Sequence, residues 1–219
     1  MTDSRARIVY VTGSSYKQDE NAIFVESVSL SDGTPVSDIA EFDIRNVEIK
    51  ETLEISIAKM VEAEAKSAYS TLRVPCVVEH AGLVFEEYIE RPDDEQYPGG
   101  LTKPMWNSLG ERFLEEVSED GRRVVAKAVV GYCDGERLHT FTGTTSGRLA
   151  GSLRGDRVFY WDTLFVPDDQ EAPGGKTYAE LVAAHGLEYK VRELSQSTKA
   201  MKSFLEWRRG AQTPTLWRR

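Results

Sequence analysis

This chain of 219 residues has few cysteines, no long apolar run and no start that resembles a signal peptide. Its two cysteines, Cys76 and Cys133, lie far apart in apolar stretches without metal-ligand spacing, so we expect two reduced thiols in the core. No stretch approaches the roughly 18 consecutive apolar residues of a membrane-spanning helix. The start, MTDSRAR, lacks the apolar segment of a signal peptide. Together these absences predict a cytoplasmic protein with no membrane partner.

Basic residues are fewer than acidic ones, 27 Lys and Arg against 36 Asp and Glu. The net charge is -9 at pH 7, which repels the backbone of nucleic acids and anionic membranes. A phosphate-bearing ligand must therefore be held locally by a few placed lysines, and we expect a small ligand and no nucleic acid. A hydrophobic content of 40% in 219 residues fits a single domain with a substantial core.

Elements of two kinds alternate along the chain. Short β-branched runs that end at turn residues predict strands, and apolar residues at helical spacing predict amphipathic helices. The expected strands cover 7–13, 36–42, 74–85, 158–167 and the two arms of a hairpin within 123–146. The expected helices cover 14–30 with Ser14 or Ser15 as cap, the apolar stripe from Leu53 to Ala68, the stripe from Met105 to Val117, and about 195–207.

The hairpin is the clearest local signal. In RVVAKAVVGYCDGERLHTFTG, two alternating runs flank Asp134-Gly135, a dipeptide that a tight type I′ turn favours. We therefore predict an α/β fold with a mixed central sheet, flanking helices and a β-hairpin lobe. A cleft is expected between this lobe and the sheet that carries the strands at 7–13 and 74–85.

Two short stretches contain residues suited to ligand binding or catalysis. In TGSSYK at 12–17, a strand runs into glycine and hydroxyl residues at a helix start, where backbone N–H groups and the helix dipole suit a phosphate. Such turns also serve ordinary packing, so this signal alone is weak. In VPCVVEHAGLVF at 74–85, Glu79 and His80 break an apolar run that suits a buried strand.

Nine short stretches occur in a fixed order along the chain: TGSSYK, EIKE, EISIAKMVEAEAKSAY, VPCVVEHAGLVF, YPGGLTKPMW, FTGTTSGRL, FYWDTLFVPD, KTYAEL and LSQSTKAM. In the same order and at similar spacing, they resemble motifs of the inosine triphosphate pyrophosphatase family, whose members hydrolyse non-canonical purine nucleoside triphosphates to monophosphate and pyrophosphate. The resemblance covers nearly the whole chain. It implies the family's fold, a nucleoside triphosphate ligand, a divalent metal ion such as Mg²⁺ or Mn²⁺, and a homodimer.

The resemblance implies a set of phosphate-binding residues. They are Thr12, Gly13, Ser14, Lys17, Lys59 and Lys103. Ser14 stands where the family's phosphate turn has asparagine, and it keeps the capacity for hydrogen bonds. Each lysine could be a solvated surface charge, but their joint presence in an acidic protein favours a function.

The catalytic and metal-binding residues that the resemblance implies are Glu48, Glu79 and His80. Glu48 matches a glutamate that helps to hold the ion, and Glu79 matches the first of two acids, of which the second binds metal and activates the attacking water. His80 replaces that second acid. Imidazole suits Mn²⁺, Co²⁺ or Zn²⁺ better than Mg²⁺ and can act as a base, which predicts activity that falls below about pH 6.5. The alternative is that His80 is only a polar residue in a site that no longer catalyses.

The residues that the resemblance implies for binding the base are Phe159, Trp161, Asp162, Ser195 and Gln196. The family reads the keto oxygen with Ser-His-Arg, whereas this chain has Ser-Gln-Ser and lacks two strong donors. Phe159 and Trp161 can stack on a base or serve as core residues. We therefore expect that base recognition is either altered in this protein or lost.

The expected function is a metal-dependent nucleoside triphosphate pyrophosphohydrolase with altered base specificity. Two other functions stay open. One is a catalytically degenerate nucleotide-binding protein, a sensor or scaffold. The other is an enzyme that uses the same cleft for a different phosphorylated substrate, such as a sugar nucleotide.

Overall fold

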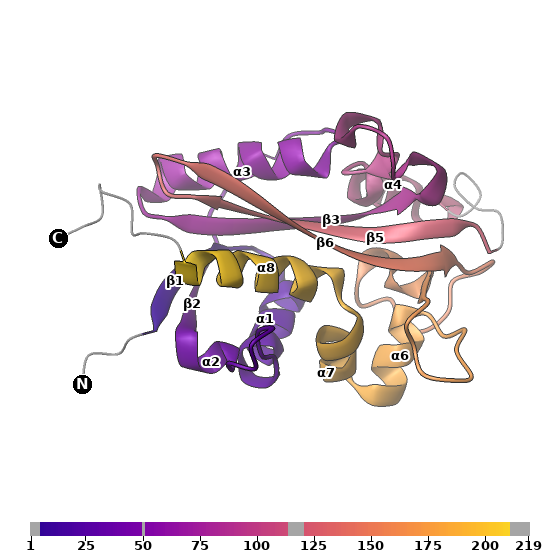
Figure 1. Cartoon of the computed structure of the whole chain (residues 1–219). Helices are drawn as coiled ribbons and strands as arrows, with labels where there is room; N and C mark the ends of the chain where they lie inside the picture. The colour runs from indigo at the N-terminus through magenta and orange to yellow at the C-terminus, as the bar shows by residue number, and fades with distance from the viewer. Residues whose placement is uncertain (1–4, 50, 114–120, 211–219) are drawn as a thin grey trace.

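A computed structural model of the chain describes residues 5–49, 51–113 and 121–210. Its strands form one mixed sheet in the order β2-β1-β3-β5-β6-β7, and β4 pairs with β3 (Figure 1). The strands are β1 (Ala6–Val11), β2 (Ala40–Arg45), β3 (Cys76–Phe85), β4 (Pro98–Gly99), β5 (Arg123–Cys133), β6 (Leu138–Leu149) and β7 (Phe165–Pro167). The predicted α/β class with a mixed sheet is confirmed.

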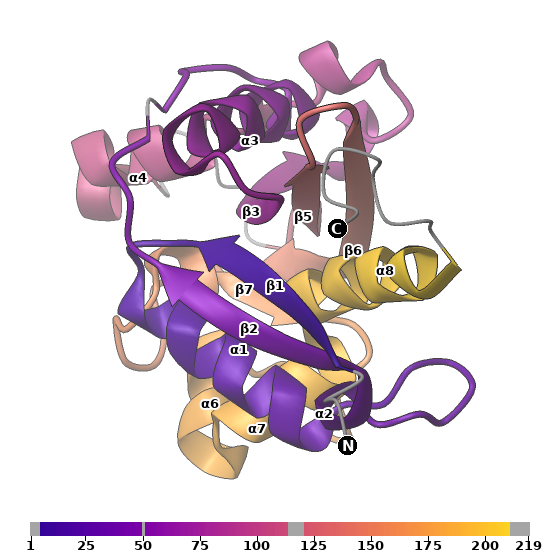
Figure 2. The same ribbon diagram turned by 90° about the vertical axis from the view of Figure 1, so that its left-hand side faces the viewer.

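Helices cover both faces of this sheet. The α-helices are α1 (Ser15–Ser27), α2 (Val36–Ile39), α3 (Ile57–Leu72), α4 (Thr102–Leu109), α6 (Tyr178–His185), α7 (Leu187–Tyr189) and α8 (Gln196–Gly210). Figure 2 shows α3 and α4 on one side of the sheet, and α1 and α8 on the other. No helix within the described ranges is long and apolar enough to cross a membrane.

The central strand β3 runs parallel to β1 and antiparallel to β5. Successive side chains of a strand point to opposite faces. Val77 accordingly joins the apolar cluster that contains Phe204 of α8, whereas Val78 joins the cluster that contains Val61 of α3. The same alternation sends Glu79 toward α1 and α8 and its neighbour His80 toward α3.

The elements predicted near both ends of the described chain are present, although α1 ends at Ser27, before the expected end at residue 30. After β1, the Ser14 hydroxyl accepts a hydrogen bond from the Lys17 backbone N–H and caps α1. In α8, the four residues expected to face inward are all buried: Ala200, Met201, Phe204 and Leu205. Both cysteines are buried and unbridged, as expected.

Two segments before α3 differ from the prediction. The expected strand at 36–42 begins as the short helix α2, because Pro35 fixes the backbone and Asp38 favours the start of a helix; β2 follows it. Leu53, assigned to the inward stripe of the next helix, is 71% exposed. The reason is that Ser56 caps α3, so the helical spacing begins only at Ile57.

Two later segments also differ. The expected strand at 158–167 is a strand only at β7, because a 3-10 turn, η4 (Tyr160–Thr163), precedes it. The expected helix from Met105 to Val117 begins as α4 and continues as a 3-10 turn, η3 (Gly110–Arg112). Gly110, with φ +56°, ends α4 because helical backbone needs negative φ. Val117 lies outside the described residues.

Strands β5 and β6 form the expected hairpin, but its turn lies one residue further along. The Asp134 N–H donates to the Arg137 carbonyl, which makes Gly135 and Glu136 the two central residues. Only Gly135 has a positive φ, +90°, whereas a type I′ turn needs positive φ at both positions. The Asp134 carboxylate accepts from the N–H groups of Glu136 and Arg137, which fixes it at the first position of the turn.

Candidate functional site

A cavity of about 780 Å³ opens where β1 and β2 end and α1 begins. Residues of α3, β3, α4 and the segment 157–160 also line it. The cleft was expected against the hairpin, but β5 and β6 contribute none of its described lining. The hairpin continues the sheet beside β3, and α4 and the segment 157–160 line the cavity together with the phosphate turn.

The phosphate turn predicted from the sequence lies in the wall of this cavity. Thr12, Gly13, Ser14 and Lys17 all line it. The Thr12 side-chain oxygen accepts from the Ser14 N–H at 3.2 Å, which holds the turn between β1 and α1. The helix therefore points its positive end at the cavity, where an anion is favoured.

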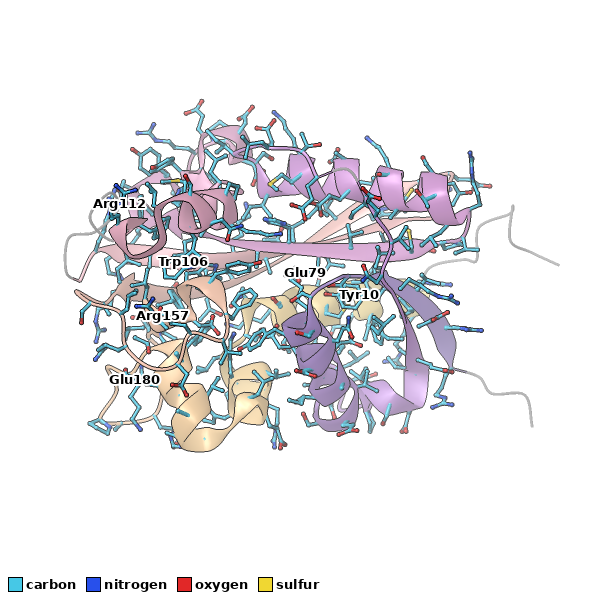
Figure 3. The ribbon with its side chains drawn as sticks, turned by 180° about the vertical axis from the view of Figure 1, so that it is seen from behind. Tyr10, Glu79, Trp106, Arg112, Arg157 and Glu180 are labelled. Carbon is cyan, nitrogen blue, oxygen red and sulfur yellow. The ribbon has the colours of Figure 1, made fainter. Side chains whose placement is uncertain are left out.

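Lys17 forms an ion pair with Glu79. Its ammonium lies 2.7 Å from the Glu79 carboxylate and donates to the Glu79 carbonyl at 2.6 Å. The Ser197 hydroxyl of α8 donates to the other carboxylate oxygen at 3.1 Å. Burial lowers the pKa of Lys17, but the charge and hydrogen bond of Glu79, together with the charges of Glu64 and Glu20, outweigh it and the pKa is raised. Figure 3 shows Glu79 beside Tyr10 above α1, with Trp106 and Arg157 further along the same side.

His80 lies on the opposite face of β3, beside Glu64 of α3. The distance from His80 Nδ1 to Glu64 Oε1 is 3.8 Å, and both residues line the cavity. Burial raises the pKa of Glu64 to about 7. Burial, together with Lys17 and Lys103, lowers the pKa of His80 to about 3. His80 is therefore neutral well below pH 6.5, and the expected loss of activity below that pH no longer follows from its titration.

The three metal ligands expected from the sequence all line the cavity, but they do not form one cluster. Glu79 and His80 point to opposite faces of β3, and among the described residues no three His, Cys, Asp or Glu side chains form a group able to hold a metal ion. Glu48 remains at the cavity wall and is exposed. Mg²⁺ often takes only one or two carboxylates when phosphates supply further oxygens. Glu48 fits such an ion, whereas the predicted trio does not.

The two other predicted lysines lie in different places. Lys103 of α4 lines the cavity, with its ammonium 3.2 Å from Glu51. Lys59 of α3 is not among the lining residues and forms an exposed ion pair with Asp94 at 2.9 Å. The structure thus brings Lys17 and Lys103 together around one space and leaves Lys59 outside it.

The predicted base-binding residues are dispersed. Only Phe159 lines the cavity, and Tyr16 of α1 stacks on its ring with the centroids 4.8 Å apart. Trp161 is 1% exposed and packs in the core against Phe165. The remaining three, Asp162, Ser195 and Gln196, are buried, and the Gln196 side chain accepts a hydrogen bond from the Tyr178 hydroxyl.

Asp162 belongs to a buried polar cluster that was not predicted. Its carboxylate lies 2.7 Å from the Lys190 ammonium and accepts from the Tyr16 hydroxyl at 3.0 Å. Glu20 of α1 also pairs with Lys190, at 3.2 Å. Burial lowers the pKa of Lys190, but the charges of Asp162 and Glu20 outweigh it and raise the pKa well above its usual range. The cluster fastens α1 to the segment that leads into α8.

Glu64 is the residue of the cavity that sequence reasoning missed although a signal was present. It lies four residues after Met60 and four before Ala68, within the apolar stripe of α3. A carboxylate on the buried face of a helix is costly unless it has a role or a partner. Tyr16 and Lys190 carried no comparable signal, because their contacts join segments far apart in the sequence.

Comparison with known proteins identifies relatives along most of the chain. The sequence profile of the Ham1 family matches residues 8–207. The dITP/XTP pyrophosphatase of Methanopyrus kandleri is 31% identical over 155 residues, which cover 69% of this chain and 74% of that protein. The inosine triphosphate pyrophosphatase of Scheffersomyces stipitis is 33% identical over 179 residues, which cover 80% of this chain and 86% of that protein.

Solved structures agree on the fold. A HAM1 protein from Coxiella burnetii superposes with a TM-score of 0.63 at 16% identity, covering 94% of this chain and 99% of the other. The Staphylococcus aureus Ham1 protein gives a TM-score of 0.57 at 17% identity with the same coverage. With a profile match across 8–207 and two named pyrophosphatases above 30% identity, the chain belongs to the Ham1 family.

Proposed function

We propose that this protein hydrolyses nucleoside triphosphates to the monophosphate and pyrophosphate. Relatives named as dITP/XTP and inosine triphosphate pyrophosphatases support the reaction class. The single observation that carries the proposal is the convergence of the α1 start, Lys17 and Lys103 on one cavity that also holds the carboxylates of Glu64 and Glu79. Cations and a helix N-terminus bind the phosphates, and carboxylates beside them can act on water.

Binding of a triphosphate requires an exchange of partners at Lys17. The ammonium now lies 2.7 Å from Glu79, and a phosphate oxygen would compete for it. Lys103 would likewise turn from Glu51 toward the phosphates. The cavity carries more carboxylates than lysines, so a bare triphosphate would meet repulsion as well as attraction. A divalent ion held between Glu48 and the phosphates would reduce that repulsion and stabilise charge on the leaving pyrophosphate.

The proposal includes an altered base preference. Tyr16 covers one face of the Phe159 ring, and Asp162 is bound to Lys190, so two residues expected to meet a base are engaged within the protein. Glutamine at position 196 also offers its side chain to Tyr178. A site arranged in this way would discriminate among bases differently from one that reads a keto oxygen with strong donors. The homodimer implied by the resemblance also stays a prediction, which sedimentation velocity tests.

The test is pyrophosphate release by the wild-type protein with a panel of nucleoside triphosphates and nucleotide sugars, each with Mg²⁺ and with Mn²⁺. We expect turnover of at least one triphosphate, with Lys17→Ala reducing it and Lys66→Ala, on the outer face of α3, leaving it unchanged. A thermal shift with a triphosphate and no turnover of any would favour the nucleotide-binding alternative. Turnover of a nucleotide sugar alone would overturn the proposed substrate class.

A further inference from the structure

Glu64 is a carboxylate that the packing of the fold does not require. It is 4% exposed and occupies the face of α3 that also buries Met60, Val61 and Ala68. An apolar residue of similar size would satisfy this helix face without the cost of removing a carboxylate from water. One of its oxygens, Oε1, has no hydrogen-bond partner within the described parts of the chain. A buried acid left in this condition points to a ligand or a reaction.

The position of Glu64 ties it to the cavity. It lines the same space as Lys17, Lys103 and the start of α1. These are the groups to which the proposed function assigns the phosphates. A triphosphate held by both lysines would lie in the same space as the Glu64 carboxylate, together with any water beside its anhydride bonds.

Neither neighbouring candidate is as well placed to act on that water. Glu79 already accepts from Lys17 and Ser197, and it lies on the other face of β3. His80 also lines the cavity, but its lowered pKa, about 3, makes its imidazole a much weaker base than the Glu64 carboxylate, whose pKa is raised to about 7. The Nδ1 of His80 lies 3.8 Å from Glu64 Oε1, so the imidazole can limit where the carboxylate turns. We therefore treat His80 as a positioning residue for Glu64.

We propose that Glu64 is the general base of the reaction, so that α3 supplies the acid that β3 lacks at position 80. This inference rests on the proposed function. In the step, a Glu64 oxygen takes a proton from water while the water oxygen bonds to a phosphorus of the scissile anhydride. The bridging oxygen leaves with the electron pair of its P–O bond, as part of pyrophosphate or of the monophosphate. The proton then passes from Glu64 to solvent.

The test compares Glu64→Gln with Glu62→Gln, a change of an exposed residue on the same helix. Glutamine keeps the shape of the side chain but cannot accept the proton. We expect kcat for pyrophosphate release to fall by about 100-fold or more in Glu64→Gln, because a positioned base contributes roughly that factor. Glu62→Gln should retain the wild-type kcat. Affinity for a non-hydrolysable triphosphate should change little in either variant.

A second variant separates a base from a structural role. Glu64→Ala should be inactive and should regain pyrophosphate release when formate is added, because formate can enter the vacated space and accept the proton. His80→Asn should lower kcat less than Glu64→Gln does. A Glu64→Gln kcat close to wild type, or a Glu64→Ala protein that formate does not restore, would overturn the role of Glu64. A wild type that binds triphosphate but never releases pyrophosphate would overturn the proposed function as well.

Discussion

At the scale of single residues, Glu64 and His80 show how burial shifts the pKa values of two neighbouring groups in opposite directions. Burial disfavours the charged form of each, so it raises the pKa of the glutamate to about 7 and lowers that of the histidine to about 3. The charged groups that face Glu64 are Lys17 on α1, Glu79 on β3, Lys103 on α4 and Glu51 in the loop before α3. The lysines oppose the shift of Glu64, and the two other carboxylates add to it.

These shifts predict opposite pH dependences of stability for two variants. The folded-state pKa of Glu64 is raised, so its contribution to stability is complete below about 4.5 and is lost as pH rises through 7. The folded-state pKa of His80 is depressed, so its contribution is lost as pH falls from about 6.5 toward 3. Each contribution changes by about 2 kcal/mol between about pH 5 and 7, and in the wild type the two nearly cancel.

Urea denaturation at both pH values measures this prediction. In Glu64→Gln only the histidine contribution remains, so the free energy of unfolding should rise from pH 5 to pH 7. In His80→Asn only the glutamate contribution remains, and the free energy should fall over the same interval. Parallel profiles for both variants and the wild type would show that the two side chains are not buried as a neutral pair.

The lysines give a prediction about ligand affinity. Lys103→Ala should weaken a non-hydrolysable triphosphate roughly tenfold, because a hydrogen bond to a charged group is worth about 1.5–3 kcal/mol. The monophosphate should be affected less, since it offers fewer charged oxygens. Lys59→Ala should have a smaller effect than Lys103→Ala, because Lys59 pairs with Asp94 outside the cavity. Calorimetric titration measures the affinity for both ligands, with Lys66→Ala as the control. If Lys103→Ala weakened the affinity for both ligands equally, Lys103 would be an ordinary surface charge.

How far the sequence predicts this site depends on how local each contact is. The phosphate turn could be read because Thr12, Ser14 and Lys17 act within one strand-turn-helix segment. Glu79 and His80 are neighbours in the sequence and suggest one site, but strand alternation places their side chains on opposite faces of β3. Lys190 meets Asp162 and Tyr16 across 28 and 174 residues of sequence, and nothing in a local pattern indicates such a contact.

At the scale of elements, strands and helices with strong patterns were predicted well, and their boundaries were not. The apolar spacing of α3 can be extended in the sequence to Leu53, but the helix itself begins only after its N-cap, Ser56. In the hairpin, Asp134 and Gly135 suggested a type I′ turn. The carboxylate of Asp134 instead accepts hydrogen bonds from the N–H groups of Glu136 and Arg137, which places the turn one residue further along.

The turn gives a prediction of its own. Gly135→Ala should destabilise the fold, because Gly135 has φ +90° and an added Cβ would meet the Tyr69 hydroxyl. Gly33 is a matched control, with φ +83° and nothing near an added Cβ. Gly33→Ala should cost about 1 kcal/mol through the backbone alone, and Gly135→Ala should cost more. Equal losses in urea denaturation would show that the contact with Tyr69 relaxes at no cost.

At the scale of the whole molecule, an acidic chain brings two lysines to one cavity. The net charge of -9 disfavours polyanions, whereas Lys17, Lys103 and the start of α1 favour a small anion at one point. The sheet supports this arrangement because β1 and β3 are adjacent and parallel, so the residues that follow β1 lie next to Glu79. Relatives named as pyrophosphatases and the groups that line the cavity both support the proposed reaction class.

The most direct measurement is the identity and ratio of the products formed from a nucleoside triphosphate by the wild-type protein, followed by phosphorus NMR. We expect nucleoside monophosphate and pyrophosphate in equal amounts, and no product in the absence of protein. Orthophosphate and nucleoside diphosphate as the first products, or binding of every triphosphate tested without turnover, would contradict the proposed pyrophosphohydrolase.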